Sequence, residues 1–219
     1  MVWTPDPDAR VHRERMARAA VRIGEPVQPR VFQALVRVPR EAFVPEAAGG
    51  AFEDRALAIG HGQTISAPHM VAIMCDLVDP RPGDRVLEVG TGSGYHAAVL
   101  AELVRPGGSV VSIEVVPELA DRARRVLHET GYGVDVEVRT GDGAAGAPDR
   151  SPFQRVSVAA ATPVVPPALL EQLAVGGRMV VPVGRRECVL TAFDRTERGL
   201  ERSEHGACVF VPLTGSRGV

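Results

Sequence analysis

The residues most able to bind a small molecule lie in a glycine-rich segment, residues 86–94, with the sequence VLEVGTGSG. An apolar run leads into glycines at alternate positions, and a stretch of helical character follows them. Glycine allows a tight turn and a close approach of the backbone to a ligand, and the helix behind the turn offers free N–H groups. We therefore expect a cofactor site formed by Glu88, Gly90, Thr91, Gly92, Ser93 and Gly94.

The spacing of these glycines separates two kinds of adenosine cofactor. Nicotinamide-binding domains use G-x-G-x-x-G, whereas the third glycine comes one residue earlier here and Tyr95 follows it. The G-x-G-x-G spacing, with Glu88 just before it, is similar to that of class I methyltransferases. A nicotinamide-linked oxidoreductase is the alternative, but the sequence offers no catalytic Tyr/Lys or His/Asp pair for it.

Two further groups follow the next two expected strands. Glu114 ends the strand 109–114, and a carboxylate there can accept hydrogen bonds from both ribose hydroxyls of an adenosine. Asp142 and Gly143 follow the strand 134–140, where an adenine edge would lie. Each feature alone has an ordinary explanation as a turn or a surface carboxylate. Their order at the ends of successive strands predicts an adenosine cofactor, S-adenosyl-L-methionine.

The elements around these residues alternate between helix and strand from residue 68 onwards. Periodicity and turn residues predict helices over 70–78, 95–104, 117–129 and 167–173, and strands over 85–90, 109–114, 134–140, 155–161 and 178–184. Two last strands, 188–195 and 208–215, have no helix between them. This order predicts an α/β, Rossmann-like class I methyltransferase fold, with a mostly parallel twisted sheet, helices on both faces and an antiparallel C-terminal part.

The chain before residue 68 has a different character. Residues 1–9 are expected to be a loose lead-in, followed by helices over 10–22 and 30–38, the second stopped by Pro39. Residues 39–67 have no long periodic segment, and a loop-rich stretch of this length is usually functional. We expect residues 1–67 to form a helical segment with a substrate loop, and residues 68–219 to form the core of one compact domain.

Several motifs lie outside the glycine turn. They are PREAFVP (39–45), Glu53-Asp54, GQTISAPHM (62–70), AAATPVVP (159–166), LLEQL (169–173), GGR (176–178), VPVG (181–184) and VPLT (211–214). Together they resemble the protein-L-isoaspartate O-methyltransferase family. The resemblance covers about residues 30 to 215 and is most specific in residues 63–70, QTISAPHM.

This resemblance implies roles for individual residues. Ser66 is expected to be the catalytic residue, holding the substrate carboxylate at the mouth of the cofactor site, while Thr64 and Ile65 shape that pocket. His69 and Val183 are expected to contact the substrate as well, and the loop 53–68 to close over the bound peptide. The alternative for Ser66 is a purely structural role, capping a helix that begins near Pro68.

The expected chemistry needs no acid–base pair. An isoaspartyl α-carboxylate has a reference pKa of roughly 3.3–3.7 and is ionised near neutral pH. The sulfonium cofactor is an activated methyl donor, so the protein has to align oxygen, methyl carbon and sulfur. We therefore do not expect His61 or His69 to act as a general base, and expect His96 to pack or to contact the cofactor.

The bulk composition excludes other classes. The formal net charge is -2, and all 25 basic residues are Arg, which excludes lysine Schiff-base chemistry and gives no electrostatic case for nucleic acid or an anionic membrane. Cys75, Cys188 and Cys208 lack metal-ligand spacing, so no metal is expected. No apolar run suits a membrane span and the N-terminus does not resemble a signal peptide. A cytoplasmic monomer acting on isoaspartyl proteins and peptides is expected.

Two departures from the family pattern leave a second substrate open. Gln154-Arg155 replaces an acidic position at the start of a strand, and the segment 184–188 is short and lacks a glutamine. The first predicts a local change in packing, and the second could change substrate recognition. The alternatives are a dedicated enzyme that converts an Asp of a ribosomal peptide to aspartimide, and an inert cofactor-binding protein, which intact Ser66 disfavours.

Overall fold

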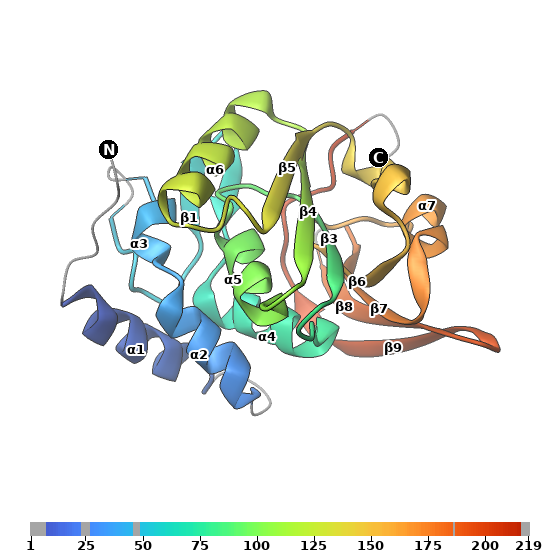
Figure 1. The fold of residues 1–219 in the computed structure, drawn as a ribbon, viewed down its shortest axis with the longest axis horizontal. Coiled ribbons are helices and arrows are strands. Elements are labelled where there is room, and N and C mark those ends of the chain that lie inside the picture. The colour runs from blue at the N-terminus through green and yellow to red at the C-terminus, as the bar shows by residue number, and fades with distance from the viewer. Residues whose placement is uncertain (1–7, 23–26, 46–48, 186, 216–219) are drawn as a thin grey trace.

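Seven strands form one mixed sheet in the computed structural model, which describes residues 8–22, 27–45, 49–185 and 187–215. Their order across the sheet is β5-β4-β3-β6-β7-β8-β9 (Figure 1). Pairing is parallel from β5 to β7 and antiparallel from β7 to β9, which confirms the predicted α/β architecture. The strands are β3 (Arg85–Val89), β4 (Ser109–Glu114), β5 (Val136–Thr140), β6 (Phe153–Val158), β7 (Leu173–Gly184), β8 (Cys188–Thr196) and β9 (Gly199–Cys208).

The chain reverses its course across the sheet next to β3. From β3 it moves outward through β4 to β5, and it then returns to the other side of β3 with β6 and β7. The connections that leave β3 and β6 therefore run to opposite sides, and a crevice opens between the carboxyl ends of these two strands. Ligands of open α/β sheets bind in such a crevice.

Helices cover both faces of the sheet (Figure 1). On one face lie α4 (Pro68–Val78), α5 (Tyr95–Val104) and α6 (Pro117–Glu129), and α1 (Ala9–Ala20) and α2 (Pro29–Arg37) pack against α4 and α5. On the other face lie α7 (Pro167–Glu171) and a 3-10 helix, Gly143–Ala145; a second 3-10 helix spans Pro148–Arg150. No helix among the described residues is long and apolar enough to cross a bilayer.

Short elements fill the segment before α4. α3 (Arg40–Phe43) is followed by a separate antiparallel hairpin of β1 (Leu57–Gly60) and β2 (Gln63–Ile65). The fully buried Arg40 ties down the loop between them, since its Nε donates to the Ala51 carbonyl at 3.1 Å and its Nη2 to the Arg55 carbonyl at 3.3 Å. In the predicted loop-rich stretch, the described residues 49–67 thus have defined contacts and bring β2 to the crevice.

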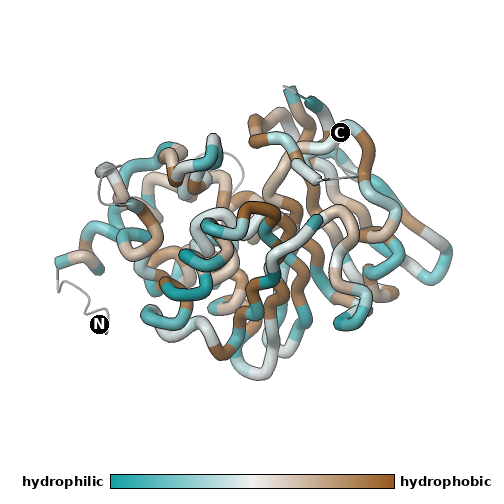
Figure 2. The backbone as a smooth tube through the Cα atoms, turned by 90° about the horizontal axis from the view of Figure 1, so that it is seen from above, coloured by the Kyte–Doolittle hydropathy of each residue, from teal (hydrophilic) through white to brown (hydrophobic). Residues whose placement is uncertain are grey.

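The C-terminal hairpin corrects one expectation. β8 begins where predicted, but its partner is β9, and the tip between them is hydrophilic (Figure 2). The predicted strand 208–215 is wrong: among residues 209–215, only Pro212 makes a bridge, an isolated one to Ala161. The side chains of β9 before Cys208 are all exposed, so the strand lacks the apolar alternation that would reveal it.

The remaining predicted elements are confirmed to within a few residues, although the first seven residues lie outside the described part.

The unusual pair Gln154 and Arg155 has defined hydrogen-bond partners near the start of β6. Gln154 Oε1 accepts from the Arg85 backbone N–H at 2.9 Å, and Arg155 Nε donates to the Asp79 carbonyl at 2.8 Å. A polar and a cationic side chain are therefore accommodated there.

Candidate active site

The glycine turn lies where the sheet opens. It connects β3 to α5, and Gly90 takes a φ of 93°, which favours glycine. A Cβ on Gly90 would lie 3.6 Å from Ala159, the residue that follows β6. The backbones at the ends of β3 and β6 thus approach each other across the crevice, as the strand order requires.

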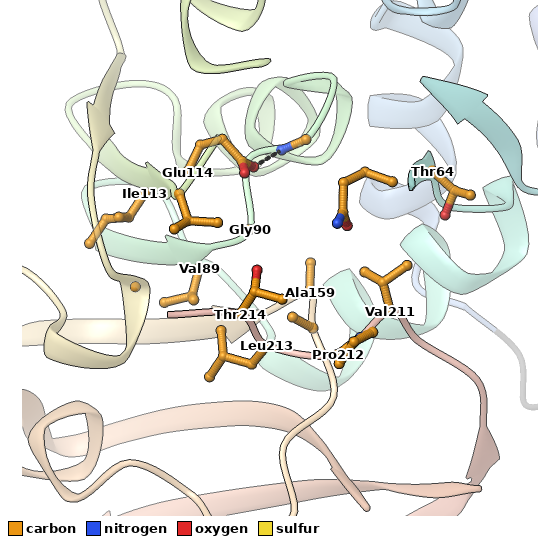
Figure 3. Close-up of a pocket in the computed structure, with 15 residues that line it drawn as sticks. Thr64, Val89, Gly90, Ile113, Glu114, Ala159, Val211, Pro212, Leu213 and Thr214 are labelled. Atoms are coloured by element: carbon orange, nitrogen blue, oxygen red, sulfur yellow. Dashed lines mark hydrogen bonds between the residues drawn. The ribbon is translucent and has the colours of Figure 1, made fainter. Parts of the chain in front are cut away.

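Glu114 holds the glycine turn from the end of β4. Its Oε2 accepts from the Gly92 backbone N–H at 2.8 Å (Figure 3), and its Oε1 accepts from the Val116 N–H at 3.0 Å. The side chain is nearly buried but lines the crevice. A carboxylate fixed in this way can also accept from ligand hydroxyls, because each oxygen has a second lone pair.

Three neighbouring hollows, together called the cleft, are all lined by Thr64 and Ala159. The first recess is lined by Gln63, Thr64, Val89, Gly90, Gly92, Ile113, Glu114, Val115, Gly143, Ala159, Ala160, Val211, Pro212, Leu213 and Thr214 (Figure 3). The inner recess is lined by Thr64, Ile65, Ser66, Val71, Gly90, Thr91, Gly92, Ser93, Tyr95, His96 and Ala159. The outer groove is lined by Asp54, Arg55, Ala56, Thr64, Ser66, Ala67, His69, Met70, Ala159, Ala207, Cys208, Val209, Phe210 and Val211.

Ser66 lies where the inner recess meets the outer groove, since it lines both. Ala67 is the residue directly before α4, and no N-cap side chain forms a hydrogen bond to this helix. The purely structural alternative for Ser66 therefore finds no support in the structure. Its half-buried hydroxyl makes no hydrogen bond to another described residue, which leaves it available to a ligand.

The side chain of Asp54, which lies 15 residues before His69 in the sequence, caps α4. Its Oδ1 accepts from the His69 backbone N–H at 2.9 Å, one of the free donors in the first turn of α4. The same carboxylate lies 3.0 Å and 3.1 Å from His69 Nδ1. The ring is thereby held at the edge of the outer groove. His61, by contrast, is exposed in the turn between β1 and β2.

Glu88 lies behind the glycine turn and has no exposed surface. Its Oε2 accepts from the Ser112 hydroxyl, which shares a hydrogen bond with Thr91, and its Oε1 lies 3.3 Å from His96 Nδ1. Burial raises the pKa of the Glu88 carboxyl to about 8, and burial lowers the pKa of His96 to about 4. Glu88 can therefore reach a ligand only through its neighbours.

Of the other residues expected at the site, some line the cleft and others do not. Gly143 lines the first recess, while the Asp142 carboxylate caps the 3-10 helix by accepting from the Ala144 N–H at 2.9 Å. Gly94 provides close packing, because a Cβ there would lie 3.3 Å from that of Ala123 on α6. Val183 on β7 lines none of the three hollows; it packs against a cluster of buried apolar residues to which Ala160 and Leu213 of the first recess belong.

The C-terminal segment forms a wall of the site, a role that was not predicted for it. Residues 211–214 line the first recess and lie across it from Glu114 (Figure 3). Backbone hydrogen bonds of 2.8 Å and 2.7 Å tie Ala161 to Val211 and Leu213. The motif VPLT was the available signal, since it is an apolar segment with proline that matches the family pattern outside any regular element.

The strand order, the glycine turn after β3 and the carboxylate at the end of β4 define a class I S-adenosylmethionine-dependent methyltransferase. The sequence model of one family of this class, described as Protein-L-isoaspartate(D-aspartate) O-methyltransferase (PCMT), matches residues 12–218. The chain belongs to this family.

Individual relatives agree with this assignment. Protein-L-isoaspartate O-methyltransferase of Methanopyrus kandleri is 53% identical over 209 residues, which cover 94% of this chain and 92% of the relative. That of Aeropyrum pernix is 50% identical over 222 residues, 99% of this chain and 85% of the relative. A solved protein-L-isoaspartate O-methyltransferase at 29% identity has a TM-score of 0.83, covering 94% of this chain and 67% of that chain.

A Plasmodium falciparum protein solved with S-adenosyl-L-homocysteine shares the fold, with a TM-score of 0.83 at 22% identity, covering 92% of this chain and 98% of that chain. The chain described here is an O-methyltransferase, and S-adenosyl-L-methionine is its methyl donor. The cleft fits this cofactor, because Glu114 faces the first recess and the buried Nε2 of His96, which lines the inner recess, has no hydrogen-bond partner among the described residues.

Proposed function

We propose that this chain methylates the free carboxylate of L-isoaspartyl residues in damaged proteins and peptides, and so begins their repair. The observation that carries the proposal is the position of Ser66, which lines both the inner recess and the outer groove. A carboxylate entering from the groove meets Ser66 where the methyl group of a cofactor in the recesses would be presented. The family assignment supports the choice of substrate.

The residues of the cleft act by binding and orientation. S-adenosyl-L-methionine supplies, when bound, a methyl group activated by its sulfonium. The Ser66 hydroxyl donates a hydrogen bond to one carboxylate oxygen, which leaves the other free to attack. Thr64 and the buried Ile65 enclose the reacting groups and exclude water, and His69, held by Asp54, borders the path of the peptide. Proximity of this kind can supply roughly 7–11 kcal/mol of a barrier.

The repair follows from the ester. The backbone nitrogen of the next residue attacks the ester carbonyl, methanol leaves, and a succinimide forms. Hydrolysis of this ring by water returns part of the material to a normal aspartyl linkage. The protein has to release its product before this step, and the outer groove, open to solvent along Val209, allows this.

We further propose a division of the chain, its partners and its place of action. Residues 1–67 form the substrate segment in front of the core, which the place of β2 and Ser66 at the cleft supports. Isoaspartyl proteins and peptides are the partners, and the protein acts as a cytoplasmic monomer without nucleic acid or membrane. The formal net charge of -2 supports the lack of a polyanionic partner; sedimentation at working concentration tests the monomer.

The test uses two synthetic peptides that differ only in an Asp or an isoaspartate at one position. Each is incubated with the protein and methyl-labelled S-adenosyl-L-methionine, and the base-labile methyl ester is counted. Label on the isoaspartyl peptide alone is the expected result. Label on neither peptide, with cofactor binding intact, would overturn general repair, and label on the Asp peptide would favour the dedicated, aspartimide-forming enzyme.

A further inference from the structure

Two cysteines face each other across the last hairpin of the sheet. Cys188 begins β8 and Cys208 ends β9, and the two residues are direct partners in the antiparallel register of these strands. Opposed residues of an antiparallel pair project their side chains to the same face of a sheet. Both cysteines accordingly belong to one cluster of buried apolar residues, and both are free thiols.

The spacing of opposed residues suits a disulfide. Directly opposed Cα atoms of an antiparallel pair lie about 5.5 Å apart where the pair exchanges backbone hydrogen bonds, and about 4.5 Å apart where it does not. A disulfide requires Cα atoms about 4.4–6.8 Å apart. Either arrangement of Cys188 and Cys208 therefore allows an S–S bond without separation of the strands.

The surroundings of the two sulfurs also place them together. The Phe210 backbone N–H donates to the Cys188 sulfur, and this contact offsets part of the rise that burial causes in the Cys188 pKa. Burial raises the pKa of Cys208 to about 11, and the neighbouring Cys188 adds to the rise. The Cys188 sulfur thus lies against the segment that directly follows Cys208.

Cys208 is the point at which the exposed strand β9 joins the cleft. Every other residue of β9, a strand that the structure describes throughout, is exposed. From Cys208 the chain continues through Val209 and Phe210 along the outer groove to residues 211–214, which form the wall of the first recess. A bond at Cys208 would therefore hold the start of this wall segment.

The two thiols differ in their access to a small reagent. Cys208 lines the outer groove, whereas Cys188 is 1% exposed and is not among the described residues that line the three hollows. A reagent can reach Cys208 from the groove, with Cys188 on the neighbouring strand. An accessible thiol with a second thiol beside it is the arrangement that disulfide exchange requires.

We propose that Cys188 and Cys208 form a redox-sensitive pair, which a small-molecule disulfide oxidises and which then fastens the wall segment to β8. The Cys208 thiolate attacks one sulfur of the reagent, whose S–S bond breaks and whose other half leaves as a thiolate. The Cys188 thiolate then attacks the Cys208 sulfur and expels the second half. The two thiols lose two protons to solvent, and their two electrons reduce the reagent. The inference does not depend on the proposed substrate.

The two steps should differ in rate. The thiolate is the attacking species, and the raised pKa of Cys208 keeps its thiolate scarce near neutral pH, so the first step is slow. The second step joins two groups that the sheet already holds side by side, so it is favoured by proximity. The mixed disulfide on Cys208 should therefore be short-lived.

The test uses 4,4′-dithiodipyridine, a small disulfide whose released half, 4-thiopyridone, is measured by its absorbance. The folded wild-type protein should release two equivalents of 4-thiopyridone and retain no adduct. Cys188→Ser should release one equivalent and retain the mixed disulfide on Cys208, visible as added mass. Cys75→Ala, at a fully buried cysteine on α4, is the matched control and should react as the wild type does.

The wild-type protein alone gives the deciding readout, which does not depend on the folding of a variant. Peptide mapping after oxidation should join the peptides that contain Cys188 and Cys208. A lasting adduct on Cys208 of the wild type, a disulfide that includes Cys75, or no reaction of the folded protein would overturn the proposal.

The fastening of the wall has its own measurements. Oxidation should raise Tm by about 5–10 °C. It should also slow amide hydrogen exchange in residues 209–214 by at least about 10-fold, with exchange in α6 unchanged. Dithiothreitol should reverse both effects, and Cys188→Ser should show neither. A disulfide that forms without slower exchange in residues 209–214 would refute the fastening. Failure of the proposed function would leave all these readouts intact, since none uses an isoaspartyl peptide.

Discussion

The Asp54 carboxylate contacts His69 at two places, accepting from its backbone N–H at 2.9 Å while lying 3.0 Å from its ring Nδ1. One side chain thus caps α4 and fixes the orientation of a ring that borders the outer groove. The fold of the segment before α4 and the shape of the groove depend on the same contact.

Replacement of the two partners should separate these roles. Asp54→Ala loses the cap, worth about 1 kcal/mol, so Tm should fall by about 3 °C and KM for an isoaspartyl peptide should rise. His69→Ala keeps the backbone N–H that donates to Asp54, so Tm should stay within about 1 °C. It removes the ring that borders the outer groove, so KM should rise. Calorimetric melting and initial rates measure both; an unchanged KM in both variants would show that the ring does not border the bound peptide.

Ser66→Ala should reduce activity without affecting stability. The hydroxyl has no protein partner among the described residues, so its removal should leave Tm within about 1 °C. Loss of one hydrogen bond to a charged carboxylate should lower kcat/KM by about 10- to 100-fold. Ser203→Ala, on the exposed strand β9, is the matched control. Equal activity of the two variants would remove Ser66 from the site.

Glu114→Ala should weaken the nucleoside end of the cofactor. Its carboxylate both faces the first recess and holds the Gly92 N–H, so binding of S-adenosylhomocysteine and 5′-methylthioadenosine should fall together, by about 100-fold. Glu118→Ala on the exposed first turn of α6 should change neither. A loss confined to S-adenosylhomocysteine would place the amino-acid end, not the ribose, at Glu114.

Glu88 should make stability depend on pH in a defined window. Burial raises its pKa in the folded protein to about 8 from an ordinary 4.5, so the folded state binds more protons than the unfolded state between these values. The contribution of Glu88 to the free energy of unfolding is fully present below about pH 4.5. It falls as the pH rises above that value and is lost as the pH passes about 8.

The Glu88→Gln variant tests this window. The difference in Tm, variant minus wild type, should increase by at least about 3 °C between pH 5 and pH 8.5 in the absence of cofactor, which corresponds to about 1 kcal/mol. Parallel melting profiles of the two proteins across this range would show that Glu88 does not titrate there.

Two nearby glycines should differ in their tolerance of a methyl group. A Cβ on Gly143 would lie 2.4 Å from Val89 Cγ1, whereas a Cβ on Gly141 would meet nothing within 4 Å. Gly143→Ala should therefore destabilise by about 1–3 kcal/mol and weaken cofactor binding, since residue 143 lines the first recess. Gly141→Ala should leave stability and cofactor binding nearly unchanged. Denaturant unfolding measures the stability of each variant, and titration calorimetry measures its cofactor binding.

The sequence predicted the parts of the site that local rules control. Strand, glycine turn and helix follow from residue types over a short stretch, so Gly90 and Glu114 could be placed at the ends of β3 and β4. Ser66 was predicted from a family motif, and it lines two of the hollows; its catalytic role remains a prediction.

The parts that could not be predicted depend on contacts between distant segments. The burial of Glu88 is set by β4 and α5 together, and the capping of α4 by Asp54 joins residues that no periodicity connects. The strand β9 was missed because its exposed polar side chains resemble a loop, and its absence from the prediction displaced the last strand to 208–215.

The wall formed by residues 211–214 has a consequence for the making of the enzyme. Synthesis runs from the N-terminus, so this wall leaves the ribosome after every other segment that lines the cleft. A nascent chain that ends after β9 has every strand of the sheet but lacks residues 211–214, so its first recess is open on that side. The capacity to methylate is therefore acquired only after residues 211–214 have emerged, and a tag or fusion placed directly after residue 215 would affect the cofactor site rather than the fold.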